Sequence, residues 1–340
     1  MKSLVLREPG FASIETVPDP TPRSGEALLR VRRIGLCGSD LNSFRGRNPL
    51  VSYPITPGHE VAATIVSLDS FSCEYSELAV GMDVTLSPYT HCGDCISCKS
   101  GRFNACQRNQ TLGVQRDGAL AEYLSIPAEK LYPAALSLEE LCLVEPLTVG
   151  FHAVARGRVR PTDIVAIFGC GGVGLGAIAA SAFRGANTIA IDIDAGKLAT
   201  ARLAGAAHTL HSGRENLAKA LSELTSGRGP DVVIEAIGTP ATFRAAVELV
   251  AFTGRVVYIG YAQEPVAYET KLFVQKELDI LGARNALPED FRAVIEMLGQ
   301  HRFPAHSAIS AVVPLDEAPA ILSAWNDNPG QFTKIMITLD

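Results

Sequence analysis

Hydrophobic and polar positions are arranged differently in the two halves of the chain, and the difference predicts two kinds of structure. Short Val-, Ile- and Leu-rich runs such as 27–34 and 61–66 lie in a proline-rich N-terminal part, which is typical of short strands joined by tight turns. Residues 162–229 contain no proline, and buried-strand patterns alternate there with helical ones. That alternation predicts a parallel sheet covered by helices on both faces.

The expected elements of this second part follow one another in a regular order. Strands are expected at 163–168, 187–192, 231–236, 255–259 and 278–282. Helices are expected at 172–184, 196–204, 217–224 and 242–250. Beyond about residue 284 the pattern becomes mixed, with a helix near 288–298 and a last strand at 335–339.

Length, composition and charge narrow the class of protein. A chain of 340 residues suggests two domains, and 47% hydrophobic with 19% charged residues is ordinary for a folded soluble protein. The formal net charge is −6 without blocks of like charge, so neither nucleic acid nor a membrane is an expected partner. The first ten residues lack a signal-peptide pattern, and the glycine cluster within the uncharged run 164–183 argues against a membrane span. We therefore expect a cytoplasmic protein.

Four of the eight cysteines are spaced as C-x2-C-x2-C-x7-C, namely Cys92, Cys95, Cys98 and Cys106. Four thiolates complete a tetrahedral shell, which is the usual form of a structural zinc site. An iron–sulfur cluster also takes four thiolates, but the ferredoxin-type proline after the last cysteine is absent. A disulfide pair is the other alternative, and it is disfavoured without a secretory signal. The spacing predicts a structural zinc lobe at about residues 88–110.

A glycine-rich turn separates the first strand and helix of the second part. Gly169, Gly171 and Gly174 form a G-x-G-x-x-G motif that Gly172 and Val173 complete. The glycines permit a tight turn, close approach of a pyrophosphate to the backbone, and packing of the helix on the strand. The free N–H groups of the helix then face the phosphates. A mere packing turn is the alternative, but the context predicts a dinucleotide site.

The end of the next strand discriminates between the two nicotinamide dinucleotides. Asp192 stands eighteen residues after Gly174, where a carboxylate accepts the ribose hydroxyls of NAD and disfavours the 2′-phosphate of NADP. Asp194 adds a second acid, whereas Lys197, a further expected cofactor contact, slightly weakens the preference. We predict NAD as the cofactor.

A second set of metal-ligating side chains is spread over the first half of the chain. Cys37 lies in a Cys-Gly-Ser-Asp segment, His59 and Glu60 in Gly-His-Glu, and Glu145 in Glu-Pro-Leu. Three protein ligands and an open fourth position make a catalytic zinc site. Each residue alone is equally explained by packing, but the set predicts a second zinc ion.

Together these motifs resemble the zinc-dependent medium-chain dehydrogenases, the family of alcohol, sorbitol and threonine dehydrogenases. The resemblance covers essentially the whole chain and implies an α/β fold. A doubly wound Rossmann NAD-binding domain is expected at 150–284, and a GroES-like β-rich catalytic domain at 1–149 and 285–340. The family also implies two zinc ions per chain, NAD, and a homodimer or homotetramer.

The resemblance assigns roles at the catalytic zinc site. Cys37 and His59 match two of the ligands, and either Glu60 or Glu145 completes the set while the other holds the water. Ser39 matches the hydroxyl that takes the substrate proton.

Three further residues bear on the histidine and on proton transfer. Asp40 matches the carboxylate that sets the tautomer of the catalytic histidine. The relay histidine of many family members is Asn42 here, so the relay is expected to pass from Ser39 through the nicotinamide ribose to water. His152 is an alternative relay, although packing explains it more simply.

Residues 282–291 resemble the hexonate 5-dehydrogenase branch, which oxidises L-galactonate or L-gulonate to keto acids. Arg284 and Asn285 would then bind the polar or anionic end of a sugar acid, unless Arg284 only forms an ion pair at the domain seam. The expected reaction is reversible, NAD-linked oxidation of a secondary alcohol of this polyhydroxylated small molecule. Neutral polyols such as sorbitol or galactitol, L-threonine, and a non-catalytic or zinc-independent relative remain alternatives.

Overall fold

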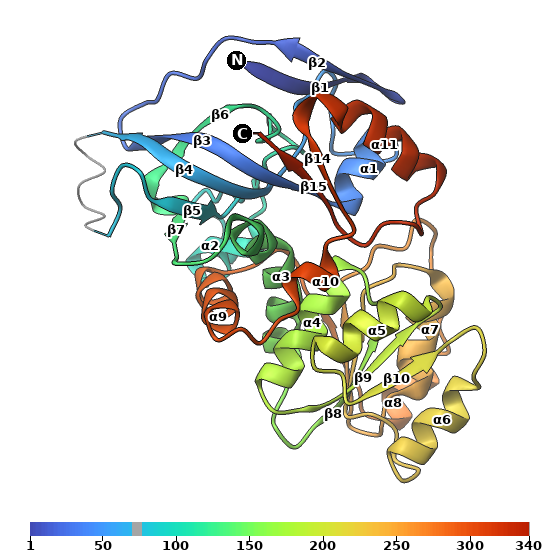
Figure 1. Ribbon diagram of the computed structural model, residues 1–340. Coiled ribbons are helices and arrows are strands. Elements are labelled where there is room, and N and C mark those ends of the chain that lie inside the picture. Colours follow the sequence, from blue (N-terminus) through green and yellow to red (C-terminus); the bar gives the residue numbers. More distant parts are fainter. Residues whose placement is uncertain (70–76, 340) are drawn as a thin grey trace. The chain divides into compact units, whose positions relative to one another are not determined.

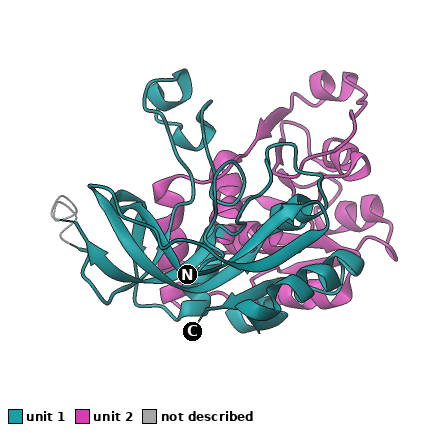
Figure 2. Cartoon of the chain, turned by 90° about the horizontal axis from the view of Figure 1, so that it is seen from above, with its two compact units in different colours: residues 1–145, 305–340 teal, residues 146–304 magenta. Residues whose placement is uncertain are grey.

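The computed structural model describes residues 1–69 and 77–339 and divides into two compact units. One comprises residues 1–145 and 305–340, and the other residues 146–304 (Figure 2). The boundaries expected from the sequence are 149/150 and 284/285. The second unit therefore extends to residue 304 rather than 284. A buried contact ties this extension to the unit, because His152 on α3 (Leu138–Arg156) lies 2.9 Å from Asp290 on α9 (Pro288–Gly299).

Six parallel strands form the sheet of the second unit, in the order β10-β9-β8-β11-β12-β13. The strands β8, β9 and β10 are labelled in Figure 1. Along the chain this order is 3-2-1-4-5-6, the doubly wound arrangement of dinucleotide-binding domains. The strands are β8 (Ile164–Phe168), β9 (Asn187–Asp192), β10 (His208–His211), β11 (Val232–Glu235), β12 (Arg255–Tyr258) and β13 (Asp279–Gly282). Five of them confirm the predicted strands, whereas the short edge strand β10 was not predicted.

Several helices of the second unit accompany this sheet. Besides α9, they are α4 (Gly172–Phe183), α5 (Ala195–Leu203), α6 (Leu217–Leu224), α7 (Pro240–Leu249) and α8 (Lys271–Gln275). Helices α4 and α5 pack against β8, β9 and β10, and α7 packs against β11 and β12. The central strand β11 is buried at every position, which explains why its sequence is a continuous apolar run before Glu235.

The first unit is built around a seven-stranded sheet in the order β14-β15-β3-β4-β5-β7, with β6 also paired to β3. Neighbouring strands are antiparallel except for β14 and β15. The strands are β3 (Glu26–Leu36), β4 (Glu60–Leu68), β5 (Asp83–Leu86), β6 (Tyr123–Pro127), β7 (Leu131–Pro133), β14 (Ala311–Pro314) and β15 (Ile335–Thr338), and β1 (Lys2–Glu8) pairs separately with β2 (Phe11–Thr16). The predicted β-rich domain is thus confirmed.

Short helices connect these strands, namely α1 (Gly38–Phe44), α2 (Ile96–Lys99), α10 (Ala305–Ala308) and α11 (Ala318–Asp327). The core of the first unit joins β1, β3, β4 and β15 to α1 and α11. None of the helices in the described ranges combines the length and apolar character that a membrane crossing needs. The uncharged run 164–183 is β8, the glycine turn and α4.

Candidate functional site

Three metal-ligating side chains meet in the first unit, since the ligand atoms of Cys37, His59 and Glu60 all lie within 4.8 Å of one another. Cys37 is the N-cap of α1, and His59 immediately precedes β4. Asp40 joins the two segments, because its carboxylate accepts the N–H of Cys37 at 2.8 Å and that of Gly58 at 3.1 Å. His59 Nδ1 lies 3.8 Å from Asp40 Oδ1, which is longer than a hydrogen bond.

Glu60 is completely buried and paired with Lys334, whose Nζ lies 2.6 Å from both carboxylate oxygens. Lys334 also donates to the carbonyl of Leu36 at 3.3 Å. Burial lowers the pKa of Lys334, but the charge and hydrogen bond of Glu60 together with the charge of Cys37 outweigh burial and raise it, so the side chain is a cation. Gly35 makes room for the pair, because a Cβ there would lie 1.9 Å from Glu60 Oε2. Lys334 was not predicted from the sequence, where it is only a single lysine directly before an apolar strand.

Glu145 lies on α3, and its Oε1 accepts a hydrogen bond from the hydroxyl of Tyr89. Both residues are buried. Burial raises the pKa of Glu145, and burial together with the charge of Glu145 raises the pKa of Tyr89 well above its usual value. One turn earlier on α3, Cys142 donates to the carbonyl of Glu60 at 3.3 Å and so links this helix to β4. Sequence reasoning also missed Tyr89.

The chemistry of this cluster fits zinc. A thiolate, an imidazole and a carboxylate are ordinary zinc ligands. In the part of the chain that the structure describes, Ser39 Oγ and His59 Nδ1 are buried without a hydrogen-bond partner. Burial lowers the pKa of His59, but Asp40 and Cys37 more than compensate and raise it well above its usual value. The cluster therefore favours positive charge, and a bound metal dication supplies it.

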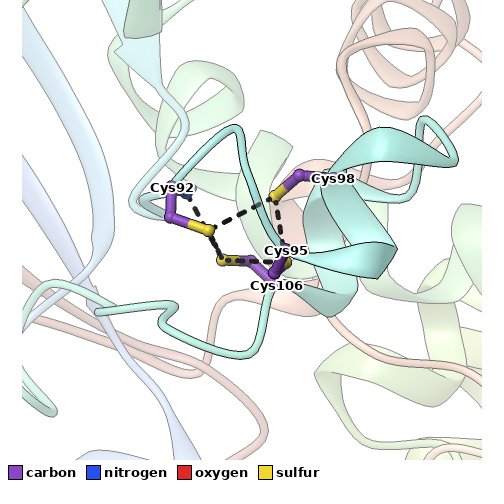
Figure 3. A group of neighbouring side chains, drawn as sticks. All are labelled: Cys92, Cys95, Cys98 and Cys106. Carbon is purple, nitrogen blue, oxygen red and sulfur yellow. Dashed lines mark hydrogen bonds between the residues drawn. The ribbon is translucent and has the colours of Figure 1, made fainter.

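The four cysteines of the predicted structural zinc lobe converge as well (Figure 3). Sulfurs bound at about 2.3 Å to one tetrahedral zinc ion lie about 3.8 Å apart. The Sγ–Sγ distances are 3.4 Å for Cys95–Cys98, 3.5 Å for Cys92–Cys106, 3.9 Å for Cys92–Cys98 and 4.0 Å for Cys95–Cys106. All are far longer than a disulfide bond, so the geometry fits a closed zinc site.

Backbone N–H groups surround these sulfurs. The N–H groups of Cys92 and Arg108 point at Cys106 Sγ from 3.4 and 3.3 Å. The N–H groups of Gln107 and Cys98 lower the pKa of Cys95 to about 6. Ionised thiols are the form that binds metal, so the backbone favours the metal-binding form of Cys95, whereas burial and the hydrogen bond with Cys95 raise the pKa of Cys98 to about 11.

The glycine motif lies between β8 and α4, as predicted. Gly169 has φ of 96°, and a Cβ on Gly174 would lie 1.9 Å from the carbonyl oxygen of Gly169, so both positions require glycine. A Cβ on Gly171 would meet nothing within 4 Å, which leaves the turn open for a pyrophosphate. Gly172 and Val173 form the first turn of α4, where N–H groups have no partner within the helix.

Asp192 ends β9 beside this turn, because its Oδ2 accepts the N–H of Cys170 at 2.7 Å. Its Oδ1 accepts the N–H of Asp194 at 3.0 Å. Each carboxylate oxygen keeps acceptor capacity for a ribose hydroxyl. Asp194 caps α5 by accepting the N–H of Lys197 at 2.9 Å, so it has a structural role that the sequence did not reveal.

The predicted substrate residues lie in the second unit, directly after β13. Arg284 is exposed, and Asn285 is half-buried with φ of 53°. The metal-ligating cluster belongs to the first unit, so a role toward substrate stays a prediction. His152 is engaged with Asp290, and the side chain of Asn42 on α1 is half-buried.

Comparison with known proteins agrees with this geometry. Residues 172–300 match the zinc-binding dehydrogenase family, and residues 23–136 match the alcohol dehydrogenase GroES-like domain. An uncharacterised zinc-type alcohol dehydrogenase-like protein of Haemophilus influenzae is 33% identical over 98% of each chain. The chain belongs to the zinc-dependent medium-chain dehydrogenase family. It is therefore an oxidoreductase, and its two metal-ligand groups fit the two predicted zinc sites.

Other proteins similar to this chain carry the names of different dehydrogenases. L-galactonate-5-dehydrogenase of Escherichia coli is 30% identical over 92% of each chain. Sorbitol dehydrogenase of Bacillus subtilis is 34% identical over 83% of this chain and 81% of its own. A crystal structure described as a short chain alcohol dehydrogenase of Escherichia coli CFT073 complexed with cofactor NADH has a TM-score of 0.91 and 27% identity, covering 100% of this chain and 99% of the other.

Proposed function

We propose that this medium-chain dehydrogenase oxidises a secondary alcohol of a sugar acid, a hexonate such as L-galactonate or L-gulonate, reversibly to the ketone with NAD. The observation that carries the proposal is the cluster of Cys37, His59 and Glu60, with Glu145 beside it. Zinc held there would supply a Lewis acid for the substrate oxygen, and NAD would supply the hydride acceptor.

The remaining chemistry belongs to side chains of the protein. Ser39 Oγ, buried and without a partner in the described ranges, would accept the hydroxyl proton of the substrate. Asp40 holds the segments of Cys37 and His59 together. Glu60 and Glu145 remain the two candidates for the third ligand, with Lys334 and Tyr89 as their respective partners.

The proposed NAD site lies at the glycine-rich turn and the end of β9. The turn from Gly169 to Gly174 would bind the pyrophosphate, and Asp192 would accept the ribose hydroxyls. A carboxylate at this position disfavours a 2′-phosphate, so NAD is preferred over NADP. Lys197, in the first turn of α5, would be a further contact of the cofactor.

Arg284 and Asn285 are proposed to recognise the anionic end of the substrate, since a guanidinium binds carboxylate in a bidentate manner. The similarity to an L-galactonate-5-dehydrogenase supports this choice. The similarity to a sorbitol dehydrogenase favours a second candidate, a neutral polyol. L-threonine is a third candidate substrate.

NADH formation by the zinc-loaded protein with L-galactonate, L-gulonate, sorbitol, galactitol and L-threonine tests the proposal. Turnover confined to a hexonate supports it, and equal or faster turnover of a neutral polyol overturns the sugar-acid assignment. Arg284→Ala should reduce hexonate oxidation far more than oxidation of a simple secondary alcohol. Arg292→Ala, which removes another exposed arginine of the same unit, is the matched control. Equal losses on both substrates for Arg284→Ala contradict a carboxylate contact.

We further propose a homodimer or homotetramer that works in the cytoplasm. Light scattering coupled to size-exclusion chromatography distinguishes these assemblies from a monomer.

A further inference from the structure

Tyr89 touches the candidate catalytic site from the start of the lobe that carries the four cysteines. Its hydroxyl donates a hydrogen bond to Oε1 of Glu145, which lies 56 residues away in the sequence. Tyr89 is 7% exposed and Glu145 is 3% exposed, so the contact is shielded from water. A hydrogen bond to a buried carboxylate is stronger than one at the surface and restricts where the carboxylate points.

The two carboxylates beside Cys37 and His59 have different partners. Glu60 is neutralised by the ammonium group of Lys334, whereas Glu145 is held by a neutral phenol. Glu60 groups with the metal-ligating atoms of Cys37 and His59 within 4.8 Å, and Glu145 lies outside that group. The partner of Glu145 therefore bears directly on how far this carboxylate can approach a bound metal.

Tyr89 is well placed to hold Glu145, because its own backbone is anchored. Tyr89 forms a β-bridge with Thr111, and the neighbouring residues add hydrogen bonds from Leu112 N–H to Pro88 O at 3.1 Å and from Thr90 N–H to Gln110 O at 3.2 Å. These paired segments are the two stems of the loop that carries the four cysteines, whose first member is Cys92. The phenol thus projects from a fixed support rather than from a free loop.

We propose that Tyr89 is a positioning residue of the catalytic zinc site, which orients Glu145 and keeps this carboxylate from entering the inner coordination shell of the metal. The proposal rests on the assignment of Glu145 to that site in the proposed function. Without the hydroxyl, Glu145 loses the hydrogen bond from Tyr89 and moves toward the metal cation. It then occupies or crowds the open position that the substrate oxygen needs.

Tyr89→Phe removes the hydroxyl and keeps the ring. Residues that orient metal ligands typically change activity or metal affinity by about 10- to 100-fold, so we expect kcat to fall by about that factor while KM changes much less. With cobalt in place of the catalytic zinc, we expect the visible absorption bands of the variant to shift, because the ligand set of the metal changes. Tyr53→Phe is the matched control, since it removes a tyrosine hydroxyl that donates to the carbonyl of Ser43 in the same unit.

Three outcomes overturn the proposal. The first is a cobalt spectrum of Tyr89→Phe that equals that of the wild type, and the second is an equal shift in Tyr53→Phe. The third is a shift that persists when Tyr89→Phe is added to a Glu145→Gln background, because a residue that acts through Glu145 should add nothing there.

A second measurement covers the case in which Tyr89→Phe does not fold, and the cobalt spectrum separates this proposal from the proposed function. If Tyr89→Phe does not fold, 3-fluorotyrosine at position 89 keeps the hydrogen bond, and its ¹⁹F resonance should move when zinc enters the catalytic site. An unchanged resonance overturns the proposal. The cobalt spectrum requires no substrate, so inactivity on every substrate tested counts against the proposed function and leaves the role of Tyr89 to be decided by the spectrum.

Discussion

Replacing Lys334 by methionine removes the cation that neutralises Glu60 while keeping most of the side-chain volume. The side chain of Lys334 is 6% exposed and that of Glu60 is 1% exposed, so water cannot take over the lost interaction. Removing one partner of a buried ion pair typically lowers the free energy of unfolding by about 3–5 kcal/mol.

A second estimate of the stability lost in Lys334→Met gives a similar value. The variant can avoid a buried charge by protonating the carboxyl group, and protonation at pH 7 of a glutamate with an ordinary pKa of about 4.3 costs about 3.7 kcal/mol. For a domain of about this size each kcal/mol lowers Tm by about 2–4 °C. We therefore expect Tm of the zinc-free variant to be lower by about 6–20 °C.

The stability lost in Lys334→Met should depend on pH and on whether zinc is bound. Placing the carboxyl group of Glu60 in its neutral form costs less free energy at lower pH, so the deficit in stability should shrink as pH falls from 7 to 5. Zinc bound by Cys37, His59 and Glu60 replaces the missing cation, so loading the site should recover part of the lost stability.

Calorimetry of the wild type, Lys334→Met, Glu60→Gln and the double variant measures these effects. The double variant should lose less stability than the sum of the two single variants, because it buries no unpaired charge. Lys334→Arg, which keeps the cation, is the control. A zinc-free Lys334→Met variant within about 2 °C of the wild type would refute the reasoning, as would a double variant with strictly additive losses.

Three further outcomes are expected. Cys92→Ser should lower the zinc content from about two ions per chain to about one, as measured by elemental analysis, because a structural site needs all four thiolates; an unchanged content would contradict the assignment. Asp192→Ala should raise the ratio of NADP to NAD turnover by about tenfold or more, since a hydrogen bond to a charged group contributes about 1.5–3 kcal/mol, and an unchanged ratio would remove Asp192 from cofactor selection. In the metal-free lobe the pKa of Cys95 is lowered to about 6 by backbone N–H groups, so its thiolate should persist at pH 7 and protonate near pH 6. The thiolate absorbance should show this step in the wild type but not in Cys95→Ser.

The features that could be predicted from the sequence depend on residues close together in the chain. The four cysteines lie within one short loop, and the glycine motif within one turn, so their spacing alone indicates a metal lobe and a dinucleotide turn. The strands and helices of the second unit follow from local apolar periodicity in the same way. The short edge strand β10 escaped prediction because its four residues, His208–His211, carry too little apolar pattern.

The contacts that only the tertiary structure decided join residues far apart in the chain. Lys334 and Glu60 are separated by 274 positions, and Tyr89 and Glu145 by 56. Which side chain meets a buried carboxylate depends on the order and register of β3, β4 and β15 and on the path of α3, and local preferences contain no information on these. The candidate metal-ligating residues could thus be named from the sequence, whereas the residues that pair with their carboxylates became visible only in the fold.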